Sequence, residues 1–150
     1  MTSPAALTQV TLAIFRANGR LLEAGDALVA PLNLTSARWQ VLGAVALSSG
    51  ALSAPQIAAA MGVTRQGAQK QLNLLVKDGL LVQRKNPLHA RSPLYALSAR
   101  GAQTYDAAEK LWMKRAEDLA ADLPSEALQA TLHVLEAIVE RLHRPTPAKE

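Results

Sequence analysis

The segment that most constrains the fold of this chain is Ser53–Asn73, which reads SAPQIAAAMGVTRQGAQKQLN. Ser53 fits a helix N-cap, because Gln56 follows three residues later, as in a capping box. Gly62 can end this short helix, and Thr64 can cap a second helix directly after it. Two helices joined by so tight a turn predict a helix-turn-helix, a motif whose second helix can enter the major groove of DNA.

Two further helices are predicted before this segment. Apolar residues spaced three and four apart indicate a helix from Ala5 to about residue 27 or 28, with one apolar face. Thr35 or Ser36 can cap the next helix, which carries Trp39 and ends before a turn-like Ser-Ser-Gly cluster. Because Trp39 lies on an apolar face, we expect a core residue there rather than the wall of a ligand site.

A change of composition after Gly79 predicts a β-hairpin. The runs 80–85 (LLVQRK) and 92–97 (SPLYAL) are short and partly β-branched or aromatic, with NPLHAR between them. Pro93 near the start of the second run favours an edge strand, since proline has no N–H to donate to a sheet. A helix-turn-helix followed directly by a hairpin predicts a winged helix.

Long helices are predicted after the hairpin. Ser98 can cap a helix over about 99–121, and Ser125 opens a last helix whose apolar stripe is Leu128, Leu132, Leu135, Val139 and Leu142. One small winged helix cannot bury apolar stripes at both chain ends, so we expect residues 5–28 and 99–143 to form a dimer. The predicted fold is mostly α (α+β): a single domain, 1–150, with a winged helix at about 35–98 and a disordered tail at 144–150.

One face of the helix that begins at Thr64 is polar and free of acidic residues before Asp78. At about 100° per residue, an arc of about 140° holds Arg65, Gln66, Gln69, Lys70, Asn73 and Lys77. Arginine pairs with guanine edges, and glutamine or asparagine with adenine edges. A solvated helix face is the alternative, but such faces usually mix Glu with Lys. We therefore predict that this face reads DNA, while the Thr64 backbone N–H meets a phosphate.

The tip of the predicted hairpin is basic. A basic surface turn is one interpretation, but a positively charged hairpin tip beside the polar helix face suits contact with phosphates or the minor groove. The predicted DNA-binding residues are Ser53, Thr64, Arg65, Gln66, Gln69, Lys70, Asn73, Arg84, Lys85, His89 and Arg91.

Composition argues against several other classes of protein. The net charge of +4 favours an acidic partner such as nucleic acid, while the absence of cysteine excludes disulfides and thiolate chemistry. Histidines are scattered and no catalytic constellation is visible, so we expect no enzyme, metal site or cofactor. The N-terminus does not resemble a signal peptide, and no apolar run reaches about 18 residues. We therefore expect a cytoplasmic protein with no membrane partner.

The chain resembles the MarR family of bacterial transcriptional regulators over about residues 5–142. The resemblance rests on LTSARWQVLGAV, on SAPQIAAAMGVTRQGAQKQLNLLVKDGLLVQRKNP and on SPLYALSARG. It implies a two-fold dimer formed by the terminal helices, with two winged helices on a pseudo-palindromic DNA operator. Many members are repressors released by a small, often aromatic or phenolic, ligand bound between the dimer helices and the DNA-binding lobe.

The wing departs from the pattern D-x-R-D-x-R that many members carry. Here the wing reads NPLHARSP, so Arg91 can serve as the wing arginine but has no aspartate to orient it. The expected function is a homodimeric, sequence-specific DNA-binding regulator of transcription, a repressor released by a small ligand whose binding residues the sequence does not identify. The alternative is a winged-helix module that binds proteins and does not read DNA specifically.

Overall fold

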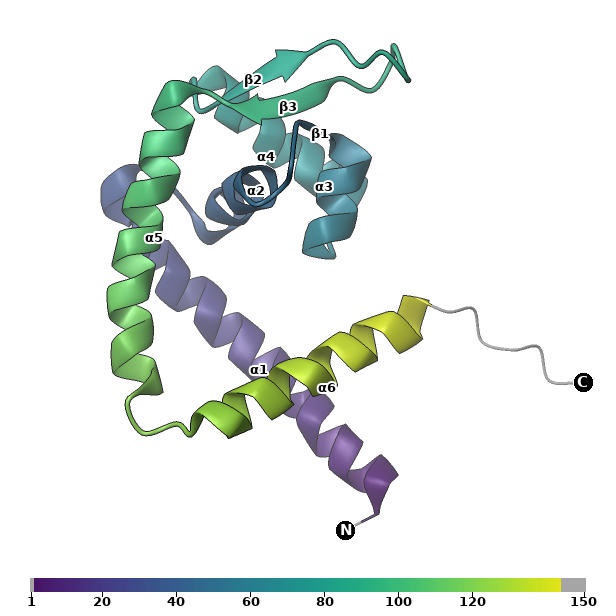
Figure 1. The fold of residues 1–150 in the computed structure, drawn as a ribbon, viewed down its shortest axis with the longest axis vertical. Coiled ribbons are helices and arrows are strands. Elements are labelled where there is room, and N and C mark those ends of the chain that lie inside the picture. Colours follow the sequence, from purple (N-terminus) through teal and green to yellow (C-terminus); the bar gives the residue numbers. More distant parts are fainter. Residues whose placement is uncertain (1, 144–150) are drawn as a thin grey trace, which may run out of the picture. The chain divides into compact units, whose positions relative to one another are not determined.

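The computed structural model describes residues 2–143 and is mostly helical, with one small sheet (Figure 1). The helices and strands in chain order are α1 (Ser3–Val29), the 3-10 helix η1 (Ala30–Leu32), α2 (Ser36–Ala46), β1 (Leu52–Ser53), α3 (Ala54–Met61), α4 (Arg65–Lys77), β2 (Leu81–Arg84), β3 (Leu94–Leu97), α5 (Ala99–Ala120) and α6 (Ser125–His143). The predicted fold class and the order of helices and hairpin are confirmed. The predicted tail, 144–150, lies outside the described residues.

The chain divides into two compact units, one ending at Trp112 and the other beginning at Met113. In the first unit, α2, α3 and α4 lie against one face of the sheet (Figure 1). The second unit holds the end of α5 and all of α6. No residue of α6 is buried within the chain.

The sheet has three antiparallel strands in the order β1-β3-β2. The expectation that the strand after Pro93 lies at an edge is therefore wrong, because β3 is central. Pro93 precedes the first paired residue, Leu94, so the ladder never needs the N–H that proline lacks. No pattern in the sequence predicts β1, because that strand has only two residues, one of which also caps α3.

Ser36 joins α1 to α2. Thr35, rather than Ser36, caps α2, since its hydroxyl oxygen accepts the Arg38 N–H at 3.3 Å. The hydroxyl of Ser36 is buried and donates to the Leu22 carbonyl at 2.8 Å. Gly25 permits this contact, because a Cβ at that position would lie 2.4 Å from the Ser36 Oγ. α1 is thus fixed to α2 by a buried hydrogen bond at a close helix crossing.

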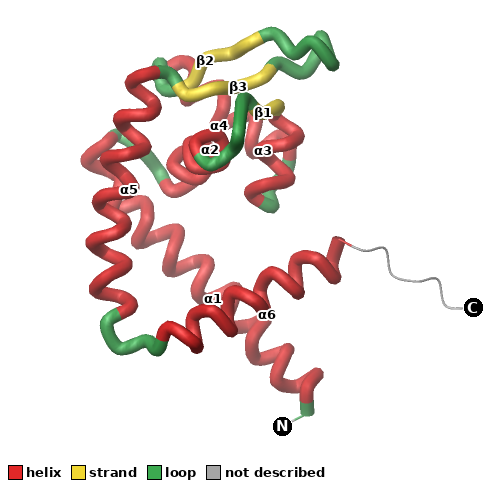
Figure 2. The backbone as a smooth tube through the Cα atoms, in the orientation of Figure 1, coloured by secondary structure: helices red, strands yellow, loops and turns green. Residues whose placement is uncertain are grey.

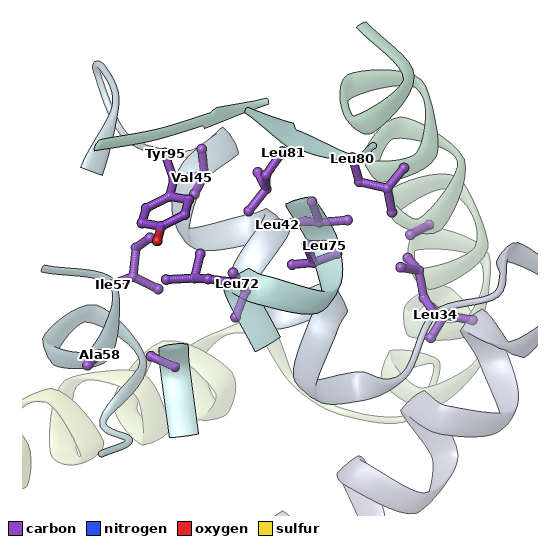
Figure 3. Close-up of a cluster of buried hydrophobic side chains, with 14 residues drawn as sticks. Leu34, Leu42, Val45, Ile57, Ala58, Leu72, Leu75, Leu80, Leu81 and Tyr95 are labelled. Carbon is purple, nitrogen blue, oxygen red and sulfur yellow. The ribbon is translucent and has the colours of Figure 1, made fainter. Parts of the chain in front are cut away.

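The apolar core of the first unit is shared by its helices and its sheet. α1, α2, α3, α4 and β2 contribute buried leucine, valine or isoleucine side chains, whereas β3 contributes Tyr95 and α5 contributes Ala108. Full burial of one large apolar side chain stabilises the fold by about 1.5–3 kcal/mol. Figure 3 shows this cluster, in which the labelled residues are Leu34, Leu42, Val45, Ile57, Ala58, Leu72, Leu75, Leu80, Leu81 and Tyr95.

The start of α5 packs directly on the turn that follows α4. The Ser98 hydroxyl accepts the Gly101 N–H at 2.9 Å, as predicted for the cap, and donates to the Gly79 carbonyl at 2.6 Å. Gly101 is buried, and a Cβ there would lie only 1.9 Å from the carbonyl oxygen of Leu80. The backbone of α5 can approach this turn only because residue 101 has no side chain.

Gly101→Ala should therefore destabilise the protein, whereas the same substitution at a helical glycine with open space around it should not. We expect its free energy of unfolding to fall by about 3 kcal/mol, since backbone must shift to admit the methyl group. Gly19→Ala is the matched control, because nothing lies within 4 Å of that position, and it should gain about 0.5–1 kcal/mol from helix propensity. Urea denaturation at one fixed protein concentration measures both. Equal midpoints for Gly101→Ala and the parent chain would contradict this packing.

Candidate nucleic-acid interface

The predicted helix-turn-helix is confirmed by α3 and α4. Ser53 forms a full capping box with Gln56: its hydroxyl accepts the Gln56 N–H at 3.4 Å, and its N–H donates to the Gln56 side chain at 2.9 Å. Gly62 ends α3 with φ of 66°, a left-handed conformation that costs glycine little. The hydroxyl of Thr64 accepts the Gly67 N–H at 3.0 Å and begins α4.

α4 has one buried face and one exposed face. Ala68, Leu72 and Leu75 are fully buried and hold the helix against the core. Of the polar residues predicted to read DNA, Gln69 is half-buried, and the exposed ones are Thr64, Arg65, Gln66, Lys70 and Asn73. The first N–H groups of α4 lie at its exposed N-terminal end, where the helix dipole favours an anion.

The buried hydroxyl of Tyr95 links this helix to the sheet. Gln69 Nε2 on α4 donates to Tyr95 Oη at 3.0 Å and to Asn73 Oδ1 at 2.9 Å. Gln83 Nε2 on β2 donates to the same Tyr95 Oη at 3.3 Å. Tyr95 itself is only 1% exposed. Two predicted DNA-contacting residues, Gln69 and Asn73, are therefore held in a network that reaches the wing.

Sequence reasoning missed Tyr95 and Gln83 as parts of this site. A usable signal was present, because a tyrosine that faces the core usually finds a hydrogen-bond partner for its hydroxyl. What the sequence could not provide was the register of β2 against β3, which sets Gln83 opposite Tyr95.

The wing is the loop 85–93, which extends beyond β2 and β3 (Figure 2). The predicted contacts in this region are all exposed: Arg84, Lys85, His89 and Arg91. Asn86 braces the loop, since its side-chain amide donates to the Ser92 carbonyl at 2.9 Å and its oxygen accepts the Leu88 N–H at 3.0 Å. Within the described chain no carboxylate pairs with Arg91, and the loop is braced by Asn86 instead.

Ser53 differs from the other predicted contacts. It is 8% exposed, and its oxygen already accepts a hydrogen bond from the Gln56 backbone. Its structural role in the capping box is therefore clear. Only the proton of its hydroxyl remains available for an outside partner.

Charge is strongly segregated along the chain. Residues 27–105 contain eight lysines or arginines and a single carboxylate, Asp78, which gives that segment a net charge of +7. The remaining residues contain eight basic and eleven acidic side chains, a net charge of −3. Asp78 lies 3.2 Å from Arg38 in an ion pair. The exposed face of α4 and the wing thus belong to a segment with almost no charge that would repel phosphate.

A cavity of about 740 Å³ lies beside α2, α5 and the end of α3. Trp39 lines it while also packing on the core, so the two roles considered for this residue coexist. The ring of Trp39 meets Trp112 edge to face, with centroids 6.0 Å apart. Tyr105 and Glu109 of α5 also line the cavity. Burial raises the pKa of Tyr105, and Glu109 raises it further as a negative charge and as a hydrogen-bond partner.

Other kinds of site find no support in the described residues. Among residues 2–143, no three His, Asp or Glu side chains come together in a way that could hold a metal ion. Across the same residues, none of the helices is both long and apolar enough to cross a membrane.

Comparison with known proteins agrees with this geometry. The MarR family model matches residues 32–92. An uncharacterized protein of Mycobacterium tuberculosis is 37% identical over 134 residues, which is 89% of this chain and 92% of that protein. A crystal structure of the MarR family transcription regulator SP03579 is 25% identical with a TM-score of 0.77, over 93% of this chain and 91% of that one.

The transcriptional repressor CouR also has this fold. Its structure bound to a 23-mer DNA duplex is 27% identical with a TM-score of 0.71, over 93% of this chain and 99% of that one. Its structure from Rhodococcus jostii RHA1 bound to p-coumaroyl-CoA has a TM-score of 0.78 at 20% identity, over 93% and 95% of the two chains. With its winged helix, its braced wing and these relatives, the chain belongs to the MarR family of transcription regulators.

Proposed function

We propose that this chain is a cytoplasmic, homodimeric repressor that reads a pseudo-palindromic DNA operator and is released by a small ligand. The observation that carries the proposal is the segregation of charge. The reading helix and the wing lie in a segment with a net charge of +7, whose one carboxylate is paired with Arg38. Such a surface gains affinity for duplex DNA by displacing condensed counterions.

The α4 face supplies sequence preference in this proposal. Arg65 and Gln66 lie in the first turn of α4, the part of a recognition helix that reaches base edges. Thr64 and the free N–H groups beside it meet a phosphate. Gln69 and Asn73 present two side-chain amides that are hydrogen-bonded to each other. Lys70 contacts the sugar-phosphate backbone of the DNA. Ser53 contributes at most its hydroxyl proton.

The wing supplies affinity with less sequence preference. Arg91, with Lys85 and His89, lies on the braced loop 85–93 next to Arg84. Arginine is favoured in narrow minor grooves because the negative potential there is enhanced. A wing held by Asn86 can keep Arg91 near the duplex without a carboxylate beside it.

Exposed apolar side chains support a dimer. On α1, Phe15 is 69% exposed, and on α6 Leu142 is 80% exposed. No residue of α6 is fully buried within its own chain although its stripe is leucine-rich. A second copy related by a two-fold axis would cover such surfaces, and the same axis would place two winged helices on a two-fold operator.

The cavity supports release by a ligand. Ala60 and Met61 at the end of α3 line it together with residues of α2 and α5. An occupant that displaces the end of α3 also displaces the turn into α4, and so alters the DNA-reading surface. CouR, which shares the fold, has been observed both on a DNA duplex and with p-coumaroyl-CoA.

Binding to duplexes selected from a random pool tests the DNA-reading proposal. We expect affinity for a two-fold site that falls steeply as salt rises, because neutralised phosphates release counterions. Arg65→Ala should weaken the selected site by about 1–3 kcal/mol and relax preference at one base pair in each half-site. Arg91→Ala should weaken selected and unrelated duplexes by similar factors. Fluorescence anisotropy at several salt concentrations measures all of these affinities.

Affinity that barely changes with salt, or an Arg65→Ala variant with unchanged preference, would overturn the assignment of the reading face. Weak, sequence-blind DNA binding would instead favour the alternative of a winged helix that binds a protein.

Tyr95→Phe tests the network that orients Gln69. Phenylalanine keeps the buried ring but removes the oxygen that accepts from Gln69 and Gln83. We expect the free energy of unfolding to fall by about 1 kcal/mol and the ratio of specific to non-specific DNA affinity to drop. Tyr105→Phe removes the other tyrosine hydroxyl and should leave that ratio unchanged. An unaltered ratio in Tyr95→Phe would mean that Gln69 needs no such support.

Leu132→Asp tests the dimer. Leu132 is 57% exposed on the α6 stripe, and a carboxylate there would have to be buried in a self-associated interface, which costs several kcal/mol when unpaired. We expect sedimentation velocity to show monomers and operator affinity to fall. His133→Asp adds the same side chain about 100° around the helix and should remain dimeric. A Leu132→Asp variant that sediments like the parent chain would exclude this stripe from the interface.

A further inference from the structure

The cavity beside α2 carries negative charge and no positive charge among the residues that line it. Its wall is mostly apolar, with Trp39, Leu47 and Met61 prominent. Glu109 is the one charged side chain in the lining, and the uncharged polar groups are Gln40, Ser48 and Tyr105. A ligand that leaves water for this space therefore exchanges solvent for aromatic and aliphatic contacts around a single carboxylate.

The surrounding charges reinforce that polarity. After burial, the influences that raise the pKa of the Tyr105 hydroxyl are the Glu109 carboxylate and, more weakly, the Asp106 carboxylate. α3 contains no charged residue. The one charged residue of α2, Arg38, lies in an ion pair with Asp78. α5 carries Arg100, Lys110, Lys114 and Arg115, but none of them lines the cavity. The lining thus offers a carboxylate-bearing ligand no cation, and Glu109 would repel it.

We propose that this cavity binds an aromatic organic cation, with a protonated amine paired to Glu109 and a ring against the Trp39 wall. The inference rests on the proposed function, in which this cavity holds the releasing ligand, and it narrows that ligand to a chemical class. An aromatic ring packed on an indole gains from ring–ring contact, and an ammonium donor to a carboxylate forms a charge-assisted hydrogen bond. The volume of about 740 Å³ is within the range of small-molecule sites.

The tryptophans provide a direct measure of occupancy. The chain has two, Trp39 and Trp112, and their rings are in contact with each other. A ligand against Trp39 should change the intrinsic fluorescence without any DNA present. Three matched probes share a phenyl ring on a three-carbon chain and differ in the head group and its charge: phenylpropylammonium, phenylpropanol and phenylpropanoate. None absorbs where tryptophan can be selectively excited.

We expect the ammonium probe to bind at least about tenfold more tightly than the carboxylate probe, as a charge-assisted contact would give. Glu109→Gln keeps the size of the side chain but removes its charge. It should therefore abolish the preference for the ammonium probe and leave the affinity for phenylpropanol unchanged. Glu117→Gln makes the same chemical change on the same helix at an exposed position outside the cavity lining, and should behave like the parent chain.

Three outcomes would overturn the inference: equal or tighter binding of the carboxylate, a cation preference that survives Glu109→Gln, or no fluorescence change with the ammonium probe at its solubility limit. These results are separable from failure of the proposed function, since probe binding is measured without DNA. If the chain binds the ammonium probe selectively but stays bound to its operator DNA, release by a ligand is overturned. The inference that the cavity binds an aromatic cation would then still hold.

Discussion

The proposed DNA-reading surface depends on the contact between a buried tyrosine hydroxyl and two glutamine amides. Tyr95 sits in the core, yet its oxygen accepts from Gln69 on α4 and from Gln83 on β2. Without that oxygen, two amide groups on different elements would lose a shared partner. One hydroxyl thus links α4 to the sheet that carries the wing, and it adds a directional contact to the packing of Ala68, Leu72 and Leu75 against the core.

The same unit combines the binding surface with a cavity of opposite polarity. Residues 27–105 carry nearly all their charge as lysine and arginine, whereas the cavity wall contributed by α5 begins the acidic part of the chain at Asp106 and Glu109. A cation attracted to the cavity would be repelled by the DNA-reading face, and DNA would be repelled by the cavity. In the proposed function, two ligands of opposite charge would in this way be directed to different places on one small fold.

The sequence predicted those features that depend on neighbouring residues. Helix caps at Ser53, Thr64 and Ser98, and the left-handed turn at Gly62, follow from local hydrogen bonds and backbone preference. It failed where distant segments meet. The pairing of β1 with β3, which makes the strand after Pro93 central, and the bond from Gln69 to Tyr95 both depend on residues far apart in the chain. Contacts with a partner are likewise not encoded in residue type, because they depend on the geometry of the complex.

The unequal anchoring of the α4 face bears on how the protein could acquire a new operator. In the described part of the chain, Arg65, Gln66 and Lys70 are exposed and make no hydrogen bond with another side chain. Replacing them should cost little stability, so successive substitutions at these positions could gradually change the DNA sequence that the protein prefers. Gln69 is different, because a change there disturbs Tyr95 and Gln83. Substitution in the proposed reading face is therefore least restricted at the start of α4 and more restricted one turn later, at Gln69.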